Sequence, residues 1–425
     1  MNKGMTNLNL LTFLILYMSG VLYAEEKVDQ LLSYTKEELR GLALKHNSQV
    51  RSMYVEWKSV VAEIAVAKSL PDPKISFTEF IEEIQTRVGP QRRKIAFSQM
   101  FPWFGTLKER KDLMAAKADL VEQKLENLRL IILHQLEITL CDIHLVDRKL
   151  VINSEHLELL LDIEMSQRGQ LKSGKGYLAN VLRVQVEKEK LKNLITTLKA
   201  FKKPLFRKLE KVLGVKLKKK IPTYVIPKNI VLDKKVLKER YLKHSPLWMS
   251  NQYDKSMQQH KMKLAKKSGK PNIGLGLSWV DTGPANNTNM MGSGKDPLAL
   301  TVLLSLPLWR SKVNAKVKSA EYSYDAMVLK DKGLMEEFES NVELVLFRIQ
   351  DALRKKKLYS EELLPKAKDA YLSSRKAHET GRISFQNMLD AERLFLRFSL
   401  DYEVALIEQA KAVADLEKMI GIRLY

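Results

Sequence analysis

The sequence predicts a mainly α-helical protein with a small membrane β part, built from two copies of one structural unit. Three observations support this prediction: short motifs recur about 200 positions apart, long stretches with helical periodicity lack internal proline, and two pairs of short segments alternate apolar with small or polar residues. A duplication of the whole chain is typical of pseudo-symmetric halves that together build one ring or barrel.

Corresponding motifs mark the two copies. One pair is Leu44-Lys45-His46-Asn47 and Leu242-Lys243-His244-Ser245, and another runs from Gly174 to Leu182 and from Gly381 to Leu389. We therefore predict three segments in the mature chain: a first structural repeat over 25–217, a linker over 218–231 that begins with lysines, and a second structural repeat over 232–425.

The N-terminus has the pattern of a secretory signal peptide. Lys3 precedes an apolar run from Leu8 to Met18, and a stretch ending in Ala24 leads to the acidic Glu25. The apolar run is too short to span a bilayer comfortably, so we expect residues 1–24 to direct export rather than to act as an anchor. Cys141 is the only cysteine, which excludes an internal disulfide.

The first repeat begins with a predicted helix over 36–69 and a strand pair over 74–100. From 104 to 172 there is no internal proline, and glycine occurs only near the two ends, so we predict one helix of about 65 residues and roughly 100 Å. It reverses at glycines near 174, and a return helix ends at Gly214. Apolar residues in steps of four and three form a coiled-coil seam along the long helix: Met114, Ala118, Val121, Leu125, Leu128 and Ile132.

The second repeat follows the same plan. We predict a helix over 232–268, a strand pair over 272–306, and a long hairpin with its tip near 381 and its end at Gly421. Pro365 should kink the outbound helix. Each return helix is too short to retrace the outbound one, so two stacked shorter helices should lie beside each long helix.

The predicted strands are apolar at every second position, and the last strand shows the pattern most clearly. In an exported chain this alternation favours a membrane barrel wall, with Leu300 and Leu304 toward lipid and Thr301 and Ser305 toward the lumen. A soluble half-buried sheet would show the same alternation. Four strands cannot close alone, so subunits must share the barrel; three copies would supply 12 strands, a number that the sequence itself does not fix.

Aromatic residues stand at the predicted strand ends. We expect them to form an aromatic belt at the membrane interface, and packing in a core is the alternative. These residues are Phe101, Trp103, Trp279 and Trp309.

Composition argues against other functions. The formal charge is +22, but the basic residues are spread along helices without a groove-reading motif, so we expect no nucleic-acid partner. No nucleophile, acid pair or phosphate loop stands out, so we expect neither an enzyme nor a cofactor. His134, Cys141 and His144 share a helix face but extend over about 15 Å, too far to bind one ion, so we expect packing there and no metal site.

Several motifs together resemble one family. In their order and spacing they make the chain similar to TolC-type outer-membrane efflux proteins over essentially its whole mature length. The resemblance implies a homotrimer in the outer membrane of a Gram-negative bacterium, with a shared β-barrel and long helical hairpins that form a periplasmic α-barrel. It also implies a periplasmic adaptor and an inner-membrane pump as partners. The motifs are Leu70-Pro71-Asp72-Pro73, the stretch from Gln99 to Leu107, Leu363-Leu364-Pro365-Lys366-Ala367, and Met388-Leu389-Asp390-Ala391-Glu392.

The resemblance also suggests site residues. Asp390 matches the position at which acidic residues line the closed periplasmic entrance, and Arg382 and Arg183 are basic candidates for the same gate. Ile383 stands where the family has its gating arginine, so the gate departs from the family pattern. The expected adaptor-docking tips are Gly174 and Gly381.

We therefore expect a passive exit duct of a tripartite system. Pro102-Trp103-Phe104-Gly105 is most similar to the drug and heavy-metal efflux branch, and type I secretion remains open. The alternative from another class is a periplasmic adaptor or coiled-coil scaffold. An adaptor normally has one hairpin flanked by small β domains, whereas two hairpins separated by strand pairs favour the duct.

Overall fold

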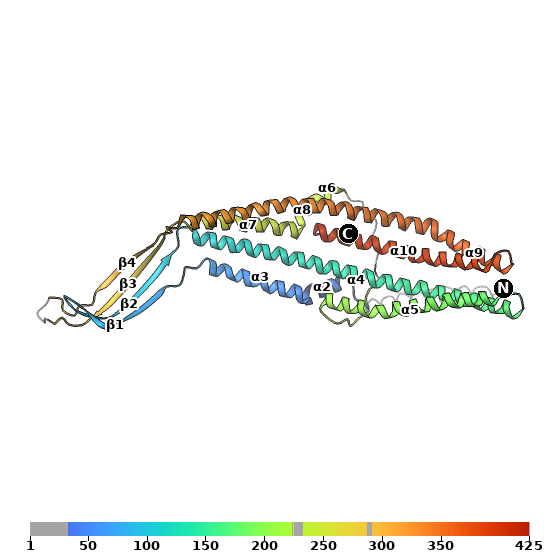
Figure 1. Ribbon diagram of the computed structural model, residues 1–425, viewed down its shortest axis with the longest axis horizontal. Coiled ribbons are helices and arrows are strands. Elements are labelled where there is room, and N and C mark those ends of the chain that lie inside the picture. Colours follow the sequence, from blue (N-terminus) through green and yellow to red (C-terminus); the bar gives the residue numbers. More distant parts are fainter. Residues whose placement is uncertain (1–32, 223, 225–232, 287–290, 425) are drawn as a thin grey trace, which may run out of the picture. The chain divides into compact units, whose positions relative to one another are not determined.

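A computed structural model describes residues 33–222, 224, 233–286 and 291–424 (Figure 1). The predicted signal peptide and most of the predicted linker lie outside the described residues. The chain divides into two compact units: one comprises Met1–Ser52, Glu126–Ser245 and Glu337–Tyr425, and the other comprises Met53–Leu125 and Pro246–Glu336. Below they are called the hairpin unit and the sheet unit. Two long helices, α4 (Thr106–Lys172) and α8 (Arg310–Leu358), run through both.

The sheet unit contains one four-stranded antiparallel sheet with the order β1-β2-β3-β4 (Figure 1). Each strand therefore pairs with its neighbour in sequence, and the first hairpin pairs with the second through β2 and β3. The strands are β1 (Lys74–Thr86), β2 (Gly89–Phe101), β3 (Asn272–Thr282) and β4 (Leu298–Ser305).

Helices α3 (Ser48–Ala67) and α7 (Pro246–Lys267) complete the sheet unit. Val60 of α3 forms a small core with Ala118 and Val121 of α4, two residues of the predicted coiled-coil seam. In the second repeat, α7 lies against α8. The Asp331 carboxylate of α8 accepts hydrogen bonds from Asn251 at 2.6 Å and from Lys255 at 2.5 Å, both in α7. Each long helix thus has a shorter helix beside it.

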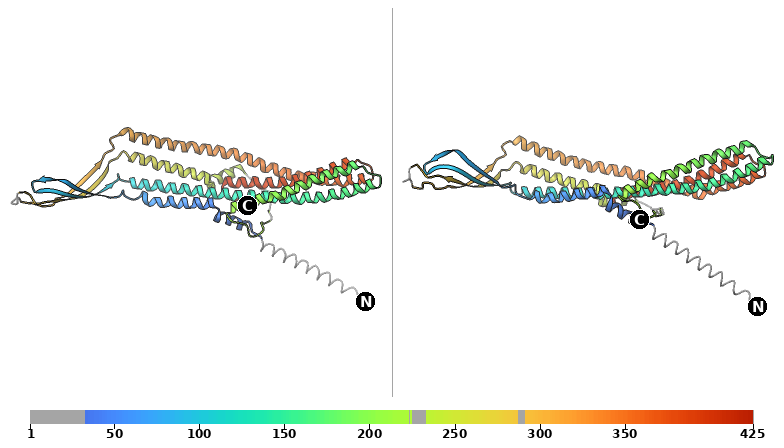
Figure 2. Two further views of the ribbon diagram at one scale, coloured as in Figure 1. Left: turned by 60° about the horizontal axis from the view of Figure 1, so that its bottom comes forward. Right: turned by 90° about the horizontal axis from the view of Figure 1, so that it is seen from below.

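The hairpin unit contains two helical hairpins and two short helices. The first hairpin is α4 with α5 (Leu178–Leu213), and the second is α9 (Leu364–Glu379) with α10 (Phe385–Ile420). Side chains from all four helices pack into one core, which includes Leu160, Val184, Tyr371 and Leu389. Both hairpins reverse at the same end of the unit (Figure 2).

The recurring Leu-Lys-His motif marks a close backbone contact in each repeat. Helix α2 (Lys36–His46) ends where the Gly214 backbone meets the His46 carbonyl, and a Cβ at Gly214 would lie 2.3 Å from that oxygen. Helix α6 (Lys234–His244) ends in the same way against Gly421, with the same 2.3 Å approach to the His244 carbonyl. Both glycines have positive φ, 71° and 81°, and end their return helices. The contact explains why glycine and this motif occur in both repeats.

A π-helical turn, η1 (Tyr359–Leu363), separates α8 from α9 and immediately precedes Pro365 in the first turn of α9. Proline cannot donate a backbone hydrogen bond, and in a regular α-helix its ring clashes with the carbonyl four residues earlier, here that of Glu361. The wider π turn accommodates the proline within a helical path. We therefore attribute the irregularity that the sequence predicts at Pro365 to this turn.

The predicted fold class is confirmed: long helices, two helical hairpins and four antiparallel strands make up the described chain. Within these described ranges, no helix has both the length and the apolar character needed to cross a membrane.

Candidate functional site

The sheet exposes its apolar face. In the inner strand β3, the apolar Ile273, Leu275 and Leu277 are exposed, whereas Ser278 and Thr282, on the other face, are each only 6% exposed. A water-soluble sheet normally buries its apolar face and exposes its polar one. The burial pattern of β3 is the reverse of this and is typical of a barrel wall whose outer surface faces an apolar solvent.

The strand register aligns the apolar residues of different strands into rows on this face. Alternate residues are about 6.8 Å apart along a strand, so the three intervals between four rows span about 20 Å of strand, or about 16 Å of height at a tilt of about 40°. That height fits within the apolar band of roughly 25 Å in outer-membrane barrels. The rows are Phe101–Ile273–Leu304, Gln99–Leu275–Val302, Ile75–Phe97–Leu277–Leu300 and Phe77–Ile95–Trp279–Leu298, and Gln99 is the one polar member.

Charges and aromatic residues border this apolar band. The next row outward is Glu79–Arg93–Asp281, in which the Arg93 guanidinium lies 3.1 Å from the Glu79 carboxylate. Trp279 occupies the last apolar row before these charges. Phe101 is in the first row, at the helix end of the sheet, and Trp103 and the exposed Trp309 lie just beyond the strands at that end. All four predicted belt residues thus stand near the ends of the strands.

The two outer strands each have one unpaired edge. Among the residues that the structure describes, β1 pairs with β2 alone and β4 pairs with β3 alone. Free N–H and C=O groups along an edge cannot remain unpaired in hydrocarbon. In a hydrocarbon environment, this sheet would therefore need further strands at both edges.

The two tips have the same backbone geometry. Gly174 has φ 74° and Gly381 has φ 75°. At each tip the glycine N–H bonds to the carbonyl three residues earlier, and the next N–H bonds to the carbonyl five residues before it: Lys175 to Gln170 at 2.9 Å, and Arg382 to Ala377 at 2.8 Å. This is the Schellman motif. A Cβ on either glycine would meet open space, so only the backbone conformation requires glycine.

Polar contacts connect the two hairpins just behind the tips. The Arg393 guanidinium of α10 lies 2.7 Å from Glu187 of α5 and 2.9 Å from Asp390 on its own helix. Arg183 of α5 donates a hydrogen bond to Gln386 of α10. Within one chain, therefore, Asp390 and Arg183 have separate partners. The exposed Arg382 lies at the tip itself.

A buried contact between a histidine and a carboxyl group lies in the same region. The ring of His156 in α4 lies 2.8 Å from the Glu392 carboxylate of α10, and both side chains are at most 3% exposed. The second buried carboxylate there, Glu164, accepts hydrogen bonds from Lys188 at 2.5 Å and from Gln185 at 2.9 Å, and these contacts lower its pKa to about 2. The sequence alone indicates neither the His156–Glu392 contact nor the contacts of Glu164 with Lys188 and Gln185, because these partners lie on other helices.

The three residues considered as metal ligands on one helix do not form a site. His134 lies 2.6 Å from Asp415, whereas Cys141 is fully buried and burial raises its pKa to about 12. The His144 ring packs against Tyr224, with ring centroids 5.9 Å apart. Glu109, Asp112 and His260 form a different cluster, which sequence reasoning also missed.

No protein-family model matches the chain, and no curated protein matches it significantly. Solved structures do match. A membrane protein from Pseudomonas aeruginosa is 15% identical, with a TM-score of 0.78 over 92% of this chain and 91% of that one. The outer-membrane channel CmeC of Campylobacter jejuni is 14% identical, with a TM-score of 0.74 over 91% and 85%. The MtrE outer-membrane channel of Neisseria gonorrhoeae is 14% identical, with a TM-score of 0.73 over 92% and 89%. The chain therefore has the TolC-type fold of these channels, as the sequence motifs led us to expect.

Proposed function

We propose that this chain is the outer-membrane channel of a tripartite export system in a Gram-negative bacterium and acts as a passive exit duct without catalysis. One observation carries the proposal: the sheet presents an apolar band to its surroundings, and its inner strand β3 exposes its apolar residues while it buries the small and polar residues of its other face. The matching fold of two proteins described as outer-membrane channels, CmeC and MtrE, supports the same location.

Strand number favours a homotrimer. The described part of one chain supplies four strands and two unpaired edges. Two copies would make eight strands, and the interior of such a barrel is just wide enough for side chains to fill. Three copies give 12 strands, the smallest multiple of four with room for a passage. The aromatic residues Phe101, Trp103, Trp279 and Trp309 would then border the lipid.

The hairpin tips are the proposed entrance. Gly174 and Gly381 would shape the surface on which a periplasmic adaptor docks, and the adaptor would connect the duct to an inner-membrane pump that supplies the energy. Asp390, Arg382 and Arg183 lie at or just behind these tips and would line the closed entrance. Opening would require the contacts between hairpins, such as Glu187–Arg393, to loosen.

The proposed cargo class rests on the sequence resemblance, which favours drugs or heavy-metal ions. The adaptor alternative has less support, because the described chain contains two hairpins and a four-stranded sheet with unpaired edges rather than one hairpin flanked by β domains.

Membrane fractionation combined with planar-bilayer recording tests the proposal. Expressed in a Gram-negative host, the full chain should sediment with the outer membrane, and the purified protein should produce discrete conductance steps. Recovery in the soluble periplasmic fraction, with no conductance, would contradict the duct and favour a scaffold.

A further inference from the structure

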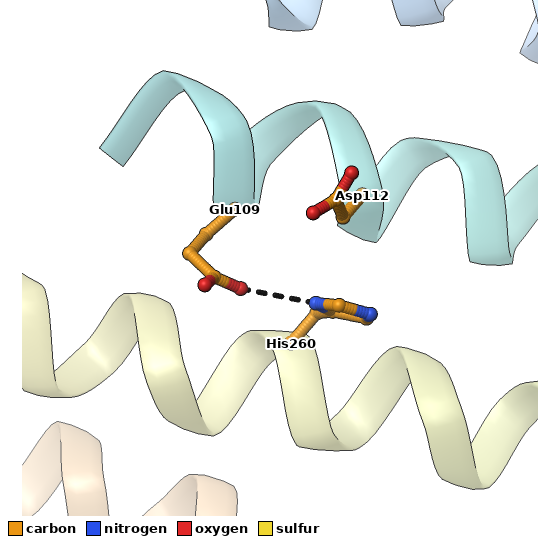
Figure 3. A group of neighbouring side chains, drawn as sticks. All are labelled: Glu109, Asp112 and His260. Carbon is orange, nitrogen blue, oxygen red and sulfur yellow. Dashed lines mark hydrogen bonds and ion pairs between the residues drawn. The ribbon is translucent and has the colours of Figure 1, made fainter. Parts of the chain in front are cut away.

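Two acidic residues and one histidine meet between α4 and α7 in the sheet unit (Figure 3). Glu109 and Asp112 are three positions apart, so they lie on one face of α4. His260 comes from α7, and its Nδ1 lies 3.0 Å from Glu109 Oε2. One ligand atom from each of the three residues lies within 4.8 Å of the other two.

This cluster differs from the histidine–carboxylate pair His134–Asp415. His134 shares Asp415 with Arg348, whose guanidinium lies 2.7 Å from the same carboxylate and balances its charge. His260, by contrast, has two carboxylates beside it. In the part of the chain that the structure describes, no other group of three histidine, cysteine or acidic side chains comes within mutual reach.

The local charge is incompletely balanced. Even a protonated His260 offsets only one of the two carboxylates, and among the described residues Asp112 forms no ion pair with lysine or arginine. The side chains of Glu109 and His260 are only 17% and 21% exposed, so solvent screens the remaining charge incompletely. A divalent cation bound to a neutral imidazole and two carboxylates would balance the site.

We propose that Glu109, Asp112 and His260 form a binding site for a divalent transition-metal ion, with Zn²⁺ the best fit. Zinc takes histidine nitrogen at about 2.0–2.1 Å and carboxylate oxygen at about 2.0–2.2 Å, which in a tetrahedral site places ligand atoms about 3.3 Å apart. The observed His260–Glu109 separation of 3.0 Å is already near this spacing. The imidazole disfavours Mg²⁺ and Ca²⁺, which prefer oxygen donors alone.

The site would connect helices from the two repeats close to the strands. Glu109 is in the first turn of α4, which follows β2, and His260 is near the end of α7, which precedes β3. Three protein ligands leave a fourth position for water. The bound ion would therefore fix the spacing of α4 and α7 where the sheet begins, whatever the chain transports.

Zinc titration of the purified full chain tests the proposal. The protein should carry an affinity tag without histidine, be treated with chelator, and be titrated calorimetrically with ZnCl₂ and separately with MgCl₂. We expect saturable binding of one Zn²⁺ per chain and no comparable Mg²⁺ binding. His260→Ala and Asp112→Asn should each weaken zinc binding by about tenfold or more, whereas His134→Ala, which removes a histidine paired with a carboxylate elsewhere, should leave it unchanged.

Asp112→Asn keeps the Glu109–His260 pair, so it decides the outcome even if His260→Ala does not fold. Zinc at about 100 times its Kd should raise the Tm of the original chain by a few degrees and that of Asp112→Asn by much less. Absence of saturable binding, or equal zinc affinity in the original chain, Asp112→Asn and His134→Ala, would overturn the proposal and leave a simple hydrogen bond between Glu109 and His260.

Discussion

Placing one charge on either face of β4 tests the assignment of the membrane-facing surface. Leu300 is 75% exposed and belongs to the row Ile75–Phe97–Leu277–Leu300, an interior row of the apolar band. Thr301 follows it, points to the other face and pairs with Gly276. Leu300→Lys and Thr301→Lys therefore put the same ammonium at nearly the same depth, on opposite sides of the wall.

The expected difference follows from the lipid environment. A lysine on the lipid face near mid-depth costs about 2 to 4 kcal/mol per chain, which corresponds to about a 30- to 900-fold change in the folding equilibrium, and the cost recurs in every copy of an oligomer. A lysine in a wet lumen should cost far less. Leu300→Ala removes the same side chain without adding charge, so it measures how much of the loss comes from volume alone.

Two measurements suit this comparison: the yield of folded oligomer in the outer membrane, and urea unfolding of protein reconstituted in lipid vesicles. We expect Leu300→Lys to lose most of the oligomer, and we expect Thr301→Lys and Leu300→Ala to retain it. Equal yields and equal urea midpoints for the two lysine variants would refute the assigned faces.

Three further predictions concern the hairpin unit and its tips. Gly381→Val forces a branched side chain into positive φ, at a cost of about 1 to 2 kcal/mol, so it should abolish export but spare assembly. The control Gly333→Val, at a helical glycine with open space around it, should retain export. Normal export by Gly381→Val would exclude a docking role for that tip. Asp390→Ala removes a half-exposed ion pair, so stability should hardly change while leak conductance in planar bilayers rises; unchanged conductance would remove Asp390 from the gate. Lys188→Met should destabilise the unit near neutral pH. Because the pKa of Glu164 is lowered to about 2, its contribution to stability is present above its unfolded pKa of about 4.3 and disappears as the pH falls toward 2. The difference in the free energy of unfolding between variant and original should therefore shrink over that range. A difference independent of pH would show that Glu164 is not the group involved.

The sequence predicts the elements whose signals are local. The helix expected over 104–172 is observed as α4 (Thr106–Lys172), because uninterrupted periodicity without proline is enough to indicate a long helix. The glycines at the tips also gave clear signals, because positive φ strongly selects that residue. The alternation in β3 and β4 predicts which residues share a face, since a strand has a strict period of two.

Features that depend on contacts between distant segments are not visible in the sequence. His156 and Glu392 are separated by 236 positions, and neither position carries a local signal of a buried hydrogen bond between side chains. The Glu109–His260 contact spans 151 positions and depends on how α4 and α7 pack. Pro365 predicts an irregularity, but proline alone does not specify that a π turn will absorb it. The charged row that ends the apolar band likewise emerges only from the pairing register of three strands.

The central claim is that copies of this chain close a shared membrane barrel through the free edges of β1 and β4. The most direct measurement is the mass of the detergent-purified complex by light scattering or native mass spectrometry, combined with its β content from circular dichroism. The claim predicts a complex of three chains that retains its full strand content. A monodisperse, folded monomer with the same strand content would contradict it.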